Sequence, residues 1–92
     1  MTSQEIITLR KSLKLSMSDF GKLFGVTPTA VQKWENGSNR PANLIEVSMD
    51  TLKNKMERAR LQGTETQEME TIAKLIVFGG LTAILIYLFT RD

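Results

Sequence analysis

The side chains that most often carry out catalysis are absent from this chain of 92 residues. It has no cysteine and no histidine, which excludes thiolate nucleophiles, disulfides, zinc–thiolate sites and an imidazole general base. An enzyme is therefore not expected, and no metal site or cofactor is indicated. The charged side chains, and where they fall along the chain, are then the first indication of function.

These charged residues divide the chain into three parts. Residues 1–60 carry ten basic and six acidic residues, a net charge of +4, whereas the whole chain has a net charge of +2. Residues 61–71 contain three acidic residues and no basic one, and residues 72–90 are apolar with a single charge, Lys74. The division predicts a basic domain over 1–60, an acidic linker over 61–71 and a hydrophobic C-terminal helix over 72–90.

Cap signals and apolar spacing predict helices over residues 2–13, 16–24, 27–36 and 43–62. Thr2, Ser16 and Thr27 stand where a hydroxyl can accept hydrogen bonds from the free N–H groups of a first helical turn. Pro28 follows Thr27 at the first helical position, where its missing N–H costs nothing. Along the fourth helix the apolar spacing of 4, 3, 4 and 3 predicts a heptad seam that could pair with a second copy, formed by Ile45, Met49, Leu52, Met56 and Ala59.

The strongest signal is the pair of short helices between Ser16 and Trp34. Gly21 is small enough to let two helix axes cross closely, and Gly25 can take a backbone conformation that would strain a side chain. The apolar residues expected to bury between these helices are Phe20, Phe24, Val26, Val31 and Trp34. This spacing predicts a helix-turn-helix.

The stretch LRKSLKLSMSDFGKLFGVTPTAVQKWENGSNRP resembles the Xre/Cro-type helix-turn-helix family of phage repressors, Cro proteins and antitoxin-type regulators. The similarity runs from about residue 4 to residue 60, and WENGSNRP after GVTPTAVQK is its most specific part. The resemblance implies an all-α fold, a bundle of about five helices that binds double-stranded DNA as a homodimer. The hydrophobic C-terminal helix would follow this bundle.

The resemblance also implies a role for individual positions, with residues 27–33 as the recognition helix. The residues at base-reading positions, or beside them, are Thr27, Pro28, Thr29, Gln32 and Lys33. Asn36 and Arg40 match positions that grip DNA phosphates, and Arg10 and Glu35 match a structural ion pair.

Two departures from the family pattern narrow this expectation. Met17 stands where the family often has a glutamine that contacts phosphate, and Pro28 replaces a polar base reader. Few side chains are therefore predicted to contact bases, and we expect the protein to recognise DNA shape in addition to making direct base contacts.

The hydrophobic segment 72–90 has three interpretations. It is long enough for a short membrane-spanning helix contacting lipid, it could form the core of a soluble oligomer, or it could be a β-hairpin turning at Gly79-Gly80. Periodicity does not separate them, because nearly every position is apolar. If the segment is one helix, Gly79 and Ala83 have the small-residue spacing that allows close helix packing.

The function predicted from the sequence is a dimeric, sequence-specific DNA-binding transcription regulator. The membrane helix would tether it to the cytoplasmic side of the cell membrane, and without that helix it would lie in the cytoplasm. The alternative is an Xre-like protein-interaction or antitoxin module that binds a toxin or another protein and uses its hydrophobic tail for oligomerisation.

Overall fold

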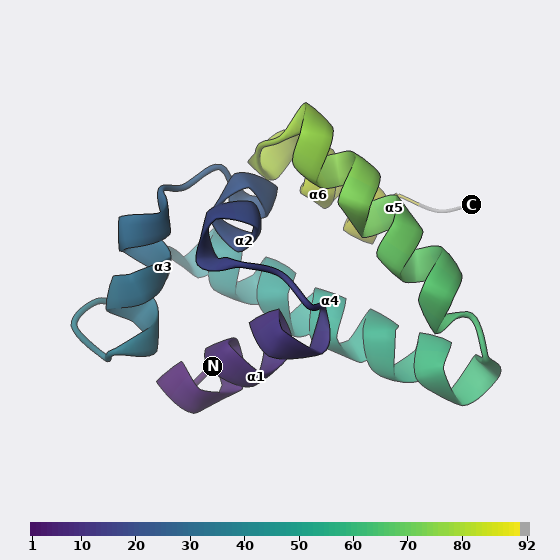
Figure 1. The fold of residues 1–92 in the computed structure, drawn as a ribbon, viewed down its shortest axis with the longest axis horizontal. Helices are drawn as coiled ribbons and strands as arrows, with labels where there is room; N and C mark the ends of the chain where they lie inside the picture. Colours follow the sequence, from purple (N-terminus) through teal and green to yellow (C-terminus); the bar gives the residue numbers. More distant parts are fainter. Residues whose placement is uncertain (91–92) are drawn as a thin grey trace.

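A computed structural model describes residues 1–90 of the chain, which form six α-helices and no strand (Figure 1). The helices are α1 (Ser3–Ser12), α2 (Met17–Phe24), α3 (Pro28–Glu35), α4 (Asn43–Gln62), α5 (Glu65–Phe78) and α6 (Leu81–Phe89). The predicted all-α class is confirmed. The predicted count of five helices within residues 1–60 is not confirmed, because only α1 to α4 occupy that range and two further helices follow.

The first three helices begin at the hydroxyl caps that the sequence indicates. Thr2 Oγ1 accepts from the N–H of Glu5 at 3.1 Å, and the Glu5 carboxylate accepts from the N–H of Thr2 at 2.9 Å. The hydroxyls of Ser16 and Thr27 accept from the third residue of their own helices at 3.0 and 3.1 Å. Each cap satisfies a backbone donor that would otherwise lack an intrahelical partner.

Helices α2 and α3 approach closely because Gly21 has no side chain. A Cβ atom at this position would lie 2.6 Å from the carbonyl oxygen of Val26, a contact that would displace the backbone. Gly25 ends α2 with φ 72° and ψ 32°, the left-handed conformation that glycine adopts without strain. Val31 and Trp34 are buried on the inner side of α3, in the same core as Phe20.

The heptad seam of α4 is buried inside the chain. Its five residues, predicted to pair with a second copy, all belong to the buried core: Ile45, Met49, Leu52, Met56 and Ala59. Helix α4 packs against α1, α5 and α6, so these elements take the place that a second copy was expected to fill. The seam is therefore not available as a dimer surface in this fold.

The prediction of a single hydrophobic helix over 72–90 is wrong, and the acidic segment 61–71 before it is not a linker. Residues 65–71 are the first half of α5, and the break comes at Gly79 and Gly80, with φ 70° and 90°. These angles, with ψ near 160°, are open essentially only to glycine, so two helices form where one was expected. The β-hairpin interpretation placed the turn correctly but expected strands in place of helices. Because Gly79 lies in this turn, it shares no helix with Ala83.

Helices α5 and α6 form a hairpin that completes the core. Ile72 and Ile84 are buried in the same core cluster as Phe20 and Leu52, so the C-terminal segment packs onto the basic part of the chain. The Tyr87 hydroxyl of α6 donates to the Glu68 carboxylate of α5, which ties the two helices together. None of the helices in residues 1–90 has the length and apolar character needed to cross a membrane, so the predicted membrane-spanning helix is not present among them.

A stability prediction follows from the cap of α1. Hydrogen bonds from the N–H and side chain of Thr2, and then from Lys53 at 3.4 Å, lower the pKa of Glu5. A carboxyl whose pKa is lower in the folded state stabilises the fold above its unfolded pKa of about 4.3, and this contribution is lost as pH falls below that value. We expect Glu5→Gln to have a shallower loss of stability between about pH 5 and pH 3 than the parent, measured by urea unfolding at each pH.

Candidate nucleic-acid interface

The outward side of α3 carries the residues predicted to read DNA bases. Thr27, Pro28, Thr29, Gln32 and Lys33 are all exposed to solvent, whereas Val31 and Trp34 are buried on the other side of the helix. Helix α3 lies at the edge of the molecule, with α2 between it and the α5–α6 hairpin (Figure 1). The hydroxyl of Thr27 already accepts the N–H of Ala30 as the helix cap. Thr29, Gln32 and Lys33 are therefore the exposed residues of this set whose polar side chains do not serve as the helix cap.

The loop after α3 carries the two residues predicted to contact phosphate. Asn36 ends the helix, and its Oδ1 accepts the N–H of Ser38 at 2.9 Å, an arrangement that leaves the amide NH₂ as a donor. Arg40 is exposed, and its Nη2 lies 3.4 Å from Oε1 of Glu46. An exposed ion pair of this kind stabilises by at most about 1 kcal/mol, so a phosphate group can compete for Arg40. The partnership with Glu46 was not predicted, because it depends on where α4 lies after the loop.

Arg10 and Glu35 form the predicted ion pair between α1 and α3. Arg10 Nε and Nη2 donate to the two Glu35 carboxylate oxygens at 2.6 and 3.0 Å, and Nη1 donates to the carbonyl oxygen of Leu15 at 3.0 Å. The side chains are 13% and 7% exposed. The hydrogen bonds to Glu35 raise the pKa of Arg10, so the guanidinium is charged at all relevant pH values. The pair fixes the C-terminal end of α3 to α1.

The structure accounts for one departure from the family pattern. Met17, at the position where the family often has a phosphate-contacting glutamine, is partly buried and packs against the core. The N-terminal end of α2 therefore contributes packing at the position where the family often has a polar contact to phosphate.

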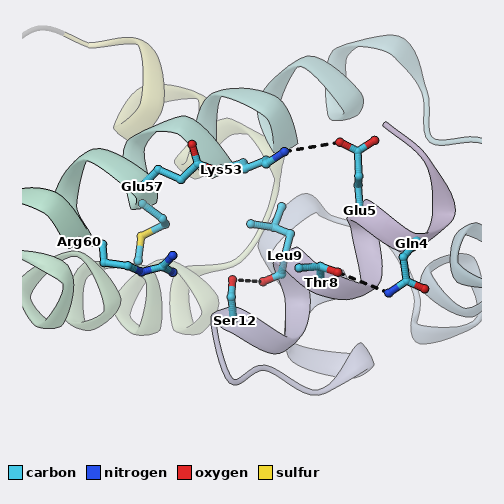
Figure 2. Close-up of a pocket in the computed structure, with 9 residues that line it drawn as sticks. Gln4, Glu5, Thr8, Leu9, Ser12, Lys53, Glu57 and Arg60 are labelled. Carbon is cyan, nitrogen blue, oxygen red and sulfur yellow. Dashed lines mark hydrogen bonds and ion pairs between the residues drawn. The ribbon is translucent and has the colours of Figure 1, made fainter.

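A separate groove of about 180 Å³ lies between α1 and α4 (Figure 2). Its buried apolar residues are Leu9 and Met56, and the Glu5–Lys53 ion pair spans α1 and α4 on its rim. No residue of α2 or α3 lines it, so it is distinct from the α3 surface. Within residues 1–90 no cluster of acidic residues could hold a metal ion.

Residues 6–50 match the helix-turn-helix family, over a segment that spans most of α1, all of α2 and α3 and the start of α4. The matched family is the Xre/Cro-type helix-turn-helix family, a DNA-binding regulatory class of protein. No curated protein and no solved structure matches the chain.

Proposed function

We propose that the protein is a sequence-specific DNA-binding regulator that places α3 in the major groove. The observation that supports this best is the division of α3 into a buried apolar side and an exposed polar side. Gln32 is suited to an adenine edge, Lys33 to guanine, and Thr29 to a hydroxyl contact or a thymine methyl group. The major groove is wide enough to admit an α-helix with its side chains.

The loop residues would position α3 on the duplex without reading sequence. Arg40 would exchange its exposed pair with Glu46 for a phosphate, and Asn36 would donate its amide to a neighbouring phosphate. The net charge of residues 1–60 is only +4, so each chain neutralises few phosphates. We therefore propose a homodimer that binds two half-sites about one helical turn of DNA apart.

One surface available for such a dimer lies on the α5–α6 hairpin. Four large apolar side chains on these helices are each more than half exposed: Val77, Phe78, Ile86 and Phe89. Helix α6 has no charged residue, so two copies of its outer side can approach without repulsion between charges. The number of chains bound per DNA duplex tests the proposed dimer, and two chains are expected.

Alanine substitutions at Lys33 and Arg40 distinguish base reading from phosphate contact. The probes are a duplex that the parent chain enriches from a random library and a random-sequence duplex of the same length. We expect Lys33→Ala to weaken binding to the enriched duplex by about 1–3 kcal/mol with little effect on the random one. Arg40→Ala is expected to weaken both alike and to lower the salt slope by about one.

Lys74→Ala is the matched control, because it removes the same charge from an exposed position on α5, outside the α3 surface. Equal losses on both duplexes for Lys33→Ala would assign Lys33 to a phosphate. The proposed function would be overturned in favour of a protein-interaction module by two results together. The parent would enrich no sequence from the library, and its affinity for DNA would not change with salt concentration.

A further inference from the structure

The turn between α5 and α6 lies against the turn of the helix-turn-helix. The N–H of Gly80 donates to the carbonyl oxygen of Lys22 in the last turn of α2 at 2.9 Å. The same carbonyl accepts the N–H of Gly25, at 3.3 Å, where α2 ends. The C-terminal hairpin thus supplies one of the hydrogen bonds that satisfy the end of α2.

The two backbones are in direct contact at Gly25. A Cβ atom on this residue would lie 3.3 Å from the nitrogen of Leu81 and 3.5 Å from the Cα of Gly80. Both neighbours are backbone atoms of the second turn, so neither can move away by a change of rotamer. A methyl group at Gly25 would require the second turn to shift by a few tenths of an ångström.

Helix α2 is held on two sides. It packs against α3 on one side and against both α5 and α6 on the other, as Figure 1 shows. Phe20 and Phe24 of α2 share one core with Ile72 and Ile84 of the hairpin. The path from α2 to α3 runs through Gly25, Val26 and Thr27, so the hairpin contact lies directly beside the start of the recognition helix.

We propose that the turn formed by Gly79, Gly80 and Leu81 is a positioning element for α3, which fixes the end of α2 and so the placement of the base-reading side chains. This inference rests on the proposed DNA-binding function and extends it to a part of the chain outside the matched family segment of residues 6–50. Gly80 and Gly25 are positioning residues in this account, since neither is offered as a contact to DNA.

The test compares Gly25→Ala with Gly63→Ala in the full chain. Both glycines end a helix in the left-handed conformation, with φ 72° and 74°, so both alanines introduce the same backbone strain. A Cβ at Gly63 meets nothing within 4 Å, whereas one at Gly25 meets the hairpin turn. The two variants share this strain, and they differ in the hairpin contact and in the position of the glycine, which precedes α3 in one case and follows α4 in the other.

We expect Gly25→Ala to lose at least as much thermal stability as Gly63→Ala, and the two variants to differ in sequence discrimination. The affinity ratio between the enriched and random duplexes is expected to fall by about fivefold or more in Gly25→Ala, the low end of what one base contact supplies, and to be unchanged in Gly63→Ala. The backbone amide resonances of α3 residues 29–33 are expected to shift only in Gly25→Ala. If Gly25→Ala does not fold, the pair Gly25→Asn and Gly63→Asn replaces it, because Asn tolerates this conformation better while keeping the Cβ.

The amide resonances need no DNA, so they test the positioning of α3 independently of the proposed function. Unchanged α3 resonances and an equal affinity ratio in both variants would overturn the inference while leaving DNA binding intact. Failure of the parent to enrich any sequence would instead count against DNA binding, and shifted α3 resonances would still support the positioning role.

Discussion

Replacing Trp34 with alanine is expected to remove a large part of the stability of the chain. The side chain is 5% exposed and belongs to the same core cluster as Phe20 and Val31. Truncating a buried Trp costs about 3–5 kcal/mol, through lost transfer free energy and the cavity left behind. The total stability expected for a chain of this size is about 5–14 kcal/mol, so a large part of it would be lost.

The measurement is thermal unfolding followed by far-UV circular dichroism, which does not depend on the fluorescence of the removed residue. The loss corresponds to a fall in melting temperature of roughly 12–40 °C. Leu61→Ala is the control, because Leu61 is 88% exposed and its truncation should change stability by no more than about 0.5 kcal/mol. A cooperative melt of the Trp34 variant within a few degrees of the parent would mean that the inner side of α3 is assigned incorrectly.

The N-terminal half of the fold was predictable because its signals are local. A cap hydroxyl at Thr2, Ser16 or Thr27 acts on backbone groups three residues away, and Gly25 acts on its own backbone. These effects need no knowledge of the rest of the chain. The exposed side of α3 followed from the same logic, since Val31 and Trp34 define the buried side and thereby the opposite one.

The C-terminal half was predicted poorly because its signals are not local. Residues 72–90 are apolar at almost every position, so no periodicity shows which side of a helix is buried or where it turns. The heptad seam of α4 was recognised correctly as a packing surface. What covers this surface, however, depends on whether the α5–α6 hairpin folds back onto α4. The spacing of apolar residues does not distinguish cover by the hairpin from cover by a second copy. The α1–α4 groove was missed for the same reason, since it joins helices that are distant in sequence. The Arg40–Glu46 pair is only six residues apart but depends on how the loop leads into α4.

Breaking the Arg10–Glu35 pair is expected to have the second largest effect on stability. Arg10→Met keeps most of the apolar stem but removes three hydrogen bonds, two to the Glu35 carboxylate and one to the carbonyl of Leu15. It leaves Glu35, whose side chain is 7% exposed, as a buried charge without its partner. Because Arg10 is 13% exposed and some water can reach the site, we expect a loss toward the lower end of the roughly 3–5 kcal/mol typical of a broken buried pair.

A double-mutant cycle separates the value of the pair from the penalty of an uncompensated charge. Adding Glu35→Leu to Arg10→Met removes the remaining charge, and the double variant is expected to regain most of the lost stability in urea unfolding. The ion pair would then specify how α3 is fixed to α1 more than it stabilises the fold. If the double variant is as unstable as Arg10→Met alone, removing the unpaired Glu35 carboxylate has restored no stability. The loss would then come from packing and from the lost hydrogen bond to the Leu15 carbonyl.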